Sequence, residues 1–544
     1  MTNLLTGPTK CLLVRPEFFE NTFYNLSNVF RLLGARSAAP PLGALIVASL
    51  LPEHWQLRFI DADVDPLTDE HFRWADIVMV SGIGPQQQTI LAVIERAHAC
   101  GKPVVVGGAG PTIQPDIYVG KADYVVVGEA EGALPRLLED LGKGVRSGVY
   151  KATEPANLRE ARVPRYDLAR LDQYLFVGLN FTRGCPFSCE YCMQIEIFGR
   201  KPRTKTPAQV LRELQTLYDL GFRGMIDFGY DNAIGDIAKA EEVLTAMAAW
   251  SDAHGHPFYF STEATMNLAR QEKLLRLMRA NDFRYIFVGI ESGDGDVLDR
   301  TKKGQNTAMS PIDAVKTLNS YGIIVNTGLI LGFDGEDRHT AGRTLDMVQK
   351  TGAFAALVLP LHALPNTQLA ARLAREGRLF GGGMVMNTND RTDTATTGLN
   401  FVTQRPRTEV LRDLANVLEQ LYEPKNHAAR VALVVSQLEP NHAHKPPLAQ
   451  VPKLALTFLR VARTIGADPK TRRHFWSGLL RALATNPAAA EMVIGSWVFN
   501  TNYAVQAKSY VAALREQIAH VESVGEADFN ARRVAPQPSP PGAQ

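Results

Sequence analysis

Short apolar runs alternate with segments of helical apolar spacing throughout residues 1–160. The runs predict five strands, at residues 11–14, 57–60, 77–80, 104–106 and 124–127. Strands that alternate with helices in this way are typical of a parallel α/β sheet. We therefore expect an N-terminal α/β domain over residues 1–160.

A second series of strands and helices occupies residues 161–404. It predicts six strands, at residues 175–181, 224–228, 257–260, 285–289, 323–331 and 355–359, with helical patterns between them such as 207–220 and 271–280. Six such units suggest a partial (β/α)6 barrel, related to the eight-stranded barrel whose chemistry lies at the carboxyl ends of the strands. Polar residues directly after these strands are therefore candidates for function.

From Arg405 onward, amphipathic helices such as residues 409–422 and 454–465 replace this alternation. We expect a helical domain over residues 405–531, followed by a disordered tail over residues 532–544 that is rich in Pro and polar residues. Residues 470–481 mix basic and large apolar side chains, as an interfacial membrane helix does. A bundle helix has the same pattern and is slightly favoured, so peripheral membrane contact through the C-terminal helices stays open.

Composition narrows the class of protein only a little. The chain has 544 residues, too many for one ordinary domain. Its formal net charge of +2 gives no reason to expect nucleic acid binding. No uncharged apolar run is long enough to predict a membrane span. An odd number of cysteines and no secretory signal predict a cytoplasmic protein, which could still contact the inner face of the membrane.

Three of the five cysteines, Cys185, Cys189 and Cys192, lie within eight residues directly after a predicted strand. A structural zinc site usually needs four ligands in two pairs, and no second pair follows at a suitable spacing. Thiolates also hold iron–sulfur clusters, and a four-iron cluster with three cysteine ligands keeps one iron open. We therefore expect a cluster here, with chance packing of reduced cysteines as the weaker alternative. Cys11 and Cys100 are expected to be buried strand and helix residues.

Two further groups of residues follow predicted strands. In the N-terminal domain they are small or turn-forming residues: Gly82 and Gly84 after the third strand, and Gly107, Gly108, Pro111 and Thr112 after the fourth. Ligands bind at such strand ends, and glycine lets them approach the backbone, although plain turns have the same sequence pattern.

In the barrel the residues that follow predicted strands are polar: Asp231, Asn232, Glu263, Glu291 and Ser292. One such Glu is usually a surface residue, but three equivalent positions around one barrel favour function.

Several motifs resemble a known family. Cys-x-x-x-Cys-x-aromatic-Cys, with Tyr191 as the aromatic residue, resembles the signature of the radical S-adenosylmethionine (SAM) enzymes. Residues 181–187 resemble the subgroup that carries an N-terminal cobalamin-binding domain. Residues 198–205, 261–264 and 363–367 are most similar to the hopanoid C-2 methylases, and the similarity runs from about Leu12 to past Tyr422.

The resemblance implies three cofactors and a place for each. Cys185, Cys189 and Cys192 would hold a [4Fe-4S] cluster, and Asp231, Asn232, Glu263, Glu291 and Ser292 would accept hydrogen bonds from the ammonium and ribose groups of SAM. The backbone between Gly328 and Gly332 would lie along adenine, unless these glycines only end a strand tightly. Cobalamin would bind the loops of an N-terminal Rossmann-like domain without a protein histidine, because no Asp-x-His-x-x-Gly loop is present. Glu129 matches the family's Gly-Glu-x-Glu turn, although an acid at a helix N-terminus is equally expected there.

The implied activity is cobalamin-dependent methyl transfer to an unactivated carbon of a lipid-like substrate, with a hopanoid at C-2 as the specific expectation. One electron, from a donor such as flavodoxin or ferredoxin, would pass through the cluster to SAM, and the resulting radical would remove a hydrogen atom. No general base is needed, so we assign no catalytic side chain.

Rival activities are a non-methylating enzyme of the same group, such as a tetrapyrrole oxidative cyclase, and a non-catalytic cobalamin sensor. Two positions depart from the hopanoid methylase pattern: Met193 stands where that family has Asp, and Tyr230 begins a triplet that reads Asp-Asp-Asn there. Both could signal a different substrate.

Overall fold

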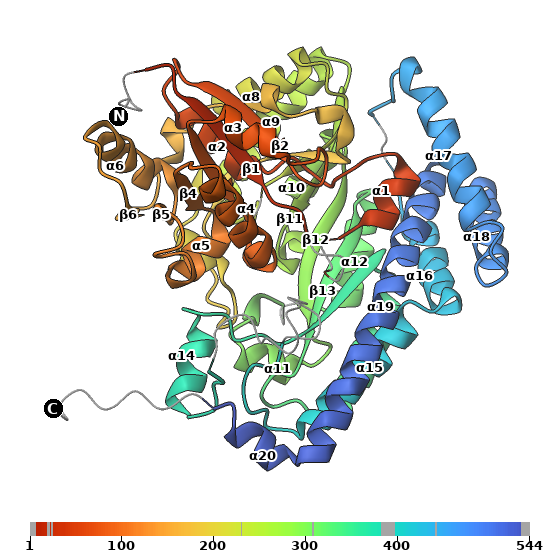
Figure 1. Cartoon of the computed structure of the whole chain (residues 1–544). Helices are drawn as coiled ribbons and strands as arrows, with labels where there is room; N and C mark the ends of the chain where they lie inside the picture. Colours follow the sequence, from red (N-terminus) through yellow and green to blue (C-terminus); the bar gives the residue numbers. More distant parts are fainter. Residues whose placement is uncertain are drawn as a thin grey trace.

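The computed structural model describes residues 7–18, 22, 25–229, 231–306, 309–381, 398–440 and 443–534. Figure 1 shows three parts: an N-terminal sheet with its helices, a second sheet at the centre, and a group of C-terminal helices along one side. This arrangement confirms the predicted fold class.

The first sheet is parallel, with strand order β2-β1-β3-β4-β5-β6. Its strands are β1 (Lys10–Arg15), β2 (Gln56–Asp61), β3 (Ile77–Ser81), β4 (Val104–Gly107), β5 (Tyr124–Val127) and β6 (Gly148–Lys151). Five strands are those predicted, whereas β6 was missed because only one of its four side chains is buried. An edge strand of this kind has no apolar run to detect.

Helices cover both faces of this sheet, which explains why its strands are apolar without alternation. Leu12 and Val14 of β1 pack toward α3 (Asp69–Trp74) and α4 (Gln87–Ala99). Cys11 and Leu13 pack in a second cluster with α2 (Leu42–Leu50) and α6 (Ala130–Gly142). Cys11 is buried in a strand, and Cys100 follows α4 in a half-buried position.

The second sheet is also parallel, and its six strands lie side by side in chain order. They are β7 (Phe176–Leu179), β10 (Gly224–Phe228), β11 (Phe258–Glu263), β12 (Phe283–Glu291), β13 (Ile324–Leu331) and β14 (Ala355–Pro360). The helices that connect them are α8 (Pro207–Asp219), α9 (Ile237–Ala253), α10 (Glu272–Ala280), α11 (Gly295–Arg300), α12 (Pro311–Ser320) and α13 (Thr340–Thr351). The six predicted strands of the partial barrel are confirmed.

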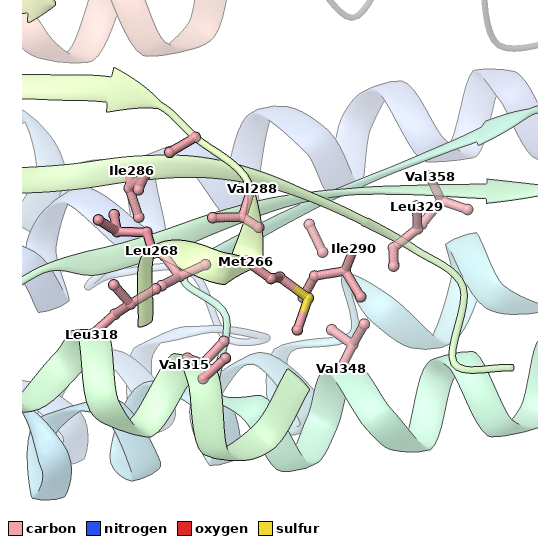
Figure 2. Packing of buried hydrophobic residues seen from close by; sticks show 14 of the residues in the cluster. Met266, Leu268, Ile286, Val288, Ile290, Val315, Leu318, Leu329, Val348 and Val358 are labelled. Atoms are coloured by element: carbon pink, nitrogen blue, oxygen red, sulfur yellow. The ribbon is translucent and has the colours of Figure 1, made fainter. Parts of the chain in front are cut away.

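Alternate side chains of the barrel strands face the surrounding helices. Figure 2 shows Ile286, Val288 and Ile290 of β12 pointing toward Val315 of α12 and Val348 of α13, all within one buried cluster. Because side chains alternate along a strand, the residues between them face the other side of the sheet. Tyr285, Phe287 and Gly289 therefore line the interior of the barrel.

The C-terminal part is helical, as predicted. After α14 (Gln368–Arg375), which follows β14, its helices are α15 (Arg407–Leu421), α16 (Pro424–Gln437), α17 (Val451–Thr464), α18 (Arg472–Thr485), α19 (Ala490–Val524) and α20 (Glu526–Ala531). The long helix α19 packs along α15 and also contacts α1 (Ser27–Leu33), near the other end of the chain. Among the described helices, none is long and apolar enough to cross a membrane.

The start of the predicted disordered tail needs correction. Gly381 donates its backbone N–H to the carbonyl of Arg533, and Phe380 forms a β-bridge with Val534. Residues 532–534 are therefore held by backbone hydrogen bonds, which a composition-based prediction cannot foresee. The rest of the predicted tail, residues 535–544, lies outside the described residues.

Candidate functional site

The carboxyl ends of the two sheets face each other. Asn366, in the loop after β14, donates its side-chain amide to the carbonyl of Ile113 in α5 (Ala109–Ile113), which follows β4 (3.1 Å). Glu129, directly after β5, pairs with Arg183, which follows β7. The loops where each sheet would bind ligands therefore enclose one common region.

Glu129 forms the central contact between the two sheets. Its side chain is only 3% exposed and accepts hydrogen bonds from Arg183 (2.6 Å), Arg203 (3.2 Å) and the backbone N–H of Ala156 (2.9 Å). Arg183 makes a further ion pair with Glu131 (2.8 Å). Glu129 is also the residue before α6, so the alternative interpretation of a helix N-terminal acid holds as well. Its contact with cobalamin stays a prediction.

Arg183 and Arg203 pair with each other in a two-stranded ribbon, β8 (Thr182–Arg183) and β9 (Arg203–Thr204). The segment between these strands contains all three cysteines of the motif, so the ribbon is the stem of the cysteine loop. Glu129 therefore attaches that stem to the N-terminal domain. Sequence reasoning missed both arginines, because nothing local marks an arginine whose partner lies 54 positions away.

The three cysteine thiols are free and lie close to amide donors. Asn232 donates to Sγ of Cys185 (3.8 Å), and Gln305 donates to Sγ of Cys189 (3.4 Å). Burial raises the pKa of Cys192 to about 11, so a ligand that needs the thiolate must displace its proton. Sulfur atoms that accept hydrogen bonds from amides fit a [4Fe-4S] cluster, whose potential such bonds adjust.

The spacing of the thiols also differs from a site for one ion. In the part of the chain that the structure describes, no three His, Cys, Asp or Glu side chains gather closely enough to hold a metal ion. In a cluster each thiolate binds its own iron, so the sulfur atoms need not converge on one point. The loop is held in place by Glu190, which pairs with Arg372 of α14 through both carboxylate oxygens (2.8 and 3.0 Å).

Carboxylates without a cationic partner lie beside the cysteine loop. Asp231 accepts the backbone N–H of Gly184 (2.7 Å) with one oxygen, and its other oxygen has no partner among the described residues. One carboxylate oxygen of Glu263 and the side-chain oxygen of Asn232 are likewise buried without a described partner. Burial raises the pKa of Asp231 to about 6 and that of Glu263 well above its usual range. Buried acceptors of this kind fit the ammonium group of SAM.

Glu291 has a different environment from the other two predicted acids. It lies at a bulge in β12 with φ of +69° and forms a buried ion pair with Lys303 (2.7 Å). Ser292 is buried and accepts the backbone N–H of Asp294 (3.2 Å). Lys303 was missed in the sequence because it lies in an ordinary polar loop. Any ligand of Glu291 must share its carboxylate with this lysine.

Gly328 and Gly332, at the same end of the barrel, each lie against a neighbouring side chain, and a Cβ on Gly332 would clash with the side chain of Leu399. A Cβ on Gly328 would lie 3.0 Å from the ring of Phe287 and 4.0 Å from the carboxylate of Glu291. The backbone N–H groups of Gly332 and Phe333 donate to Glu336 (2.9–3.1 Å), so this buried acid shapes the turn after β13. Burial raises the pKa of Glu336 to about 7. Sequence reasoning missed Glu336, although an acid four residues after the glycine could have been noticed.

In the N-terminal domain, the loops after β3 and β4 pack closely at their glycines. Gly108 has φ of +100°, and a Cβ there would lie 2.7 Å from the carbonyl oxygen of Gly82. Thr112 accepts the backbone N–H of Gly128 (3.0 Å), which joins the loops after β4 and β5. The remaining predicted cobalamin contacts, at the same edge of the sheet, are Gly84, Gly107 and Pro111. Loop packing thus accounts for Gly82 and Gly108, and cobalamin binding by this group stays a prediction.

A cavity of about 1410 Å³ occupies the interior of the barrel. Its walls carry Asp227, Ser261, Glu263, Phe287 and Asn326 from the strands, and mostly apolar residues elsewhere. Helices α17 and α19 close it with residues that include Leu454, Phe458, Phe499 and Tyr503. The cavity therefore reaches the carboxylates beside the cysteine loop and could hold a large apolar molecule.

Of the two positions that depart from the hopanoid methylase pattern, Met193 and Tyr230, the structure describes only the first. Met193 is half-buried and directly precedes α7 (Gln194–Phe198), next to Cys192. It therefore lies in the cysteine loop, where it was expected. Tyr230 lies outside the described residues.

Three family models match the chain: the radical SAM superfamily at residues 179–348, the B12 binding domain at 31–138, and a domain of unknown function (DUF4070) at 367–516. An uncharacterised methyltransferase of Synechocystis is 35% identical over 499 residues, which cover 91% of each chain. The hopanoid C-2 methylase of Rhodopseudomonas palustris is 31% identical over 453 residues, covering 82% of this chain and 84% of that protein.

Among solved structures, the radical SAM methyltransferase TsrM from Kitasatospora setae, with cobalamin and a [4Fe-4S] cluster bound, superposes with a TM-score of 0.57 at 14% identity. The match covers 84% of this chain and all of that one. At this low identity the likeness concerns the fold.

Replacing Glu129 by Gln should weaken the contact between the sheets. The change leaves Arg183 and Arg203 buried beside each other without their shared counter-charge, which should lower the free energy of unfolding by about 3 kcal/mol. The thermal unfolding midpoint should fall, and proteases should cleave the connector near residue 156 faster. Glu131→Gln is the matched control, because Glu131 is more exposed and binds only Arg183. An equal or larger effect of the control would contradict this role of Glu129.

Replacing Cys192 by Ala should remove nearly all iron from protein purified without oxygen, because a cluster with two cysteine ligands is poorly held. Iron and acid-labile sulfide per chain measure the loss. Cys100→Ala, a half-buried cysteine outside the loop, should keep its full iron content. If Cys192→Ala retained its iron, the cluster assignment would be wrong.

Replacing Asp227 by Asn should stabilise the cofactor-free protein at pH 8 and about half as much at pH 5. Asp227 accepts a hydrogen bond from Ser261, and burial raises its pKa to about 6. The folded state therefore binds a proton more tightly than the unfolded chain, and stability is lost as pH rises from the unfolded pKa of 3.8 to about 6. The gain of the variant at pH 8 should be about 3 kcal/mol. Asp219→Asn, which changes an exposed acid, should shift the unfolding midpoint little; a pH-independent effect of Asp227→Asn would refute the prediction.

Proposed function

This chain belongs to the cobalamin-dependent radical SAM methyltransferases, and we propose that it methylates an unactivated carbon of a lipid-like substrate, specifically a hopanoid at C-2. Its cofactors are those of the family: a [4Fe-4S] cluster, SAM and cobalamin. When bound, they supply the radical that removes a hydrogen atom from carbon and the methyl group that replaces it.

The observation that carries the proposal is the cavity inside the barrel. It is large and mostly apolar, and the carboxylates of Asp227 and Glu263 border it from the strands, whereas Asp167, Asp172 and Glu491 border it elsewhere. A polycyclic hydrocarbon would be desolvated along the apolar walls, with the carboxylate of Glu263 at the end near the cysteine loop. The relationship to a hopanoid C-2 methylase over most of both chains supports this substrate class.

In this proposal each group of site residues has its own role. Cys185, Cys189 and Cys192 hold the cluster, and Asp231 with Glu263 binds the ammonium group of SAM through the oxygens that lack a described partner. Glu291, neutralised by Lys303, faces the ribose, and the backbone at Gly328 admits the adenine. Asn232 and Gln305 keep the cysteine sulfurs oriented. The mostly apolar walls of the cavity would exclude water from the reacting carbon.

Electrons must reach the cluster from outside, and a flavodoxin or ferredoxin is the donor we propose. The cysteine loop and the buried carboxylates argue against a cobalamin sensor, because a sensor needs neither. A non-methylating cyclase would use the same cofactors. Only a methyltransferase releases S-adenosylhomocysteine together with deoxyadenosine, so the two products distinguish them.

Hopanoids from a host that makes them, lacks its own C-2 methylase and receives cobalamin should become one methylene heavier when this chain is expressed. Mass spectrometry of the extracted lipids measures the change. Cys192→Ala should give unmodified hopanoids, and Cys100→Ala should behave like the unchanged chain. Unmodified hopanoids from cluster-loaded protein would refute the substrate but not the family, and Met193 and Tyr230 would then be the first positions to exchange.

A further inference from the structure

Helices α17 and α18 expose an unusual number of large apolar side chains. They project at the edge of the molecule, with α19 beside them (Figure 1). Exposed fractions reach 62% at Leu459 of α17 and 63% at Leu480 of α18. In α17 only Val461 is buried, so most of this helix faces solvent.

The exposed apolar residues form stripes rather than scattered positions. In α17, Leu456 and Leu459 are three residues apart, and in α18, Trp476 and Leu480 are four apart, so each pair lies on one side of its helix. A neighbouring side of α18, about 100° around the helix, carries Phe475, Leu479 and Ala482, which pack into the buried cluster with α16 and α19. Helix α18 is therefore a bundle helix on one side and an unpartnered apolar surface on the other. Trp476 also contacts Phe458 of α17 (ring centroids 6.4 Å apart), which joins the two helices.

Basic residues surround these stripes. Residues 443–490 contain eight Lys or Arg and a single acid, Asp468, although the whole chain has a net charge of only +2. Among the ion pairs of the described residues, none involves Arg463, Lys470, Arg473 or Arg481. The positive charge of this segment is therefore available to an external anionic partner.

We propose that the exposed face of α17 and α18 docks on an anionic lipid bilayer, with Leu456, Leu459, Trp476 and Leu480 inserted at the headgroup boundary and the basic residues on lipid phosphates. Exposed leucines and tryptophan next to unpaired arginines are the composition of helices that lie in a membrane interface. A second copy of the chain fits this face less well, because two surfaces of the same positive charge would repel each other.

The docked orientation also gives the cavity an entrance from lipid. Lys453, Leu454 and Phe458 of α17 line the cavity, and Leu454 is also exposed. A substrate dissolved in the bilayer could thus enter beside α17 without crossing water. This entrance rests on the proposed lipid substrate, whereas the docking itself requires only the helices.

Sedimentation with vesicles tests the docking. The full-length holoprotein should sediment with vesicles of phosphatidylcholine and phosphatidylglycerol, and far less with phosphatidylcholine alone. The double variant Leu459→Glu/Leu480→Glu should bind the anionic vesicles at least ~10-fold less, because two inserted apolar side chains are lost. The matched control Val119→Glu/Val149→Glu changes similarly exposed residues of the N-terminal domain and should bind normally. Arg463→Gln/Arg473→Gln should weaken binding and its dependence on salt.

Two outcomes would overturn the proposal. One is that the unchanged protein does not bind anionic vesicles, or that the leucine double variant binds as well as the control. The other is a dimer in sedimentation velocity without lipid that the leucine substitutions abolish, which would assign the face to a second copy of the chain. Since the vesicles contain no hopanoid, a failure here is separate from a failure of the proposed methylation.

Discussion

The buried carboxylate of Glu129 is the interaction on which the arrangement of this molecule depends. It neutralises Arg183 and Arg203, which pair across the ribbon that forms the stem of the cysteine loop. Buried charges tolerate few alternative positions, because each must keep its partner or bear an uncompensated charge. The network therefore holds the cysteine loop against the carboxyl edge of the N-terminal sheet, so that the two candidate cofactor sites face one region.

Three of the acidic side chains in that region have no cationic partner among the described residues. Asp227 is buried and Asp231 and Glu263 are half-buried near one another, and desolvation raises the pKa of each. Such a group of acids costs folding free energy in the empty protein and favours a cation when one binds. Glu291 does not favour a bound cation in this way, because Lys303 already neutralises it. The acids around Glu263 would therefore attract positive charge, whereas the Glu291–Lys303 pair is neutral.

The C-terminal helices combine two tasks. Helix α19 closes the barrel with Phe499 and Tyr503 and supports α18 through their shared apolar cluster. Helix α17 contributes to the wall of the same cavity while most of its surface faces solvent. The cavity in the barrel and an exposed apolar, basic surface therefore meet at helix α17. This link between cavity and surface is what a substrate taken from a bilayer would require.

The sequence by itself determined the strands and helices of both sheets and the cysteine loop, because apolar periodicity and residue spacing are local properties. It also placed Asp231, Glu263 and Glu291 at strand ends. It missed β6, an edge strand with one buried side chain, and it did not reveal Lys303 or Glu336 as partners within the site. It could not decide whether α18 is a bundle or a surface helix, since both have one apolar side. Only the tertiary structure decided that Glu129 holds two arginines, that α18 buries one side and exposes another, and that the two sheet edges face each other, because ion pairs and burial depend on residues distant in the chain.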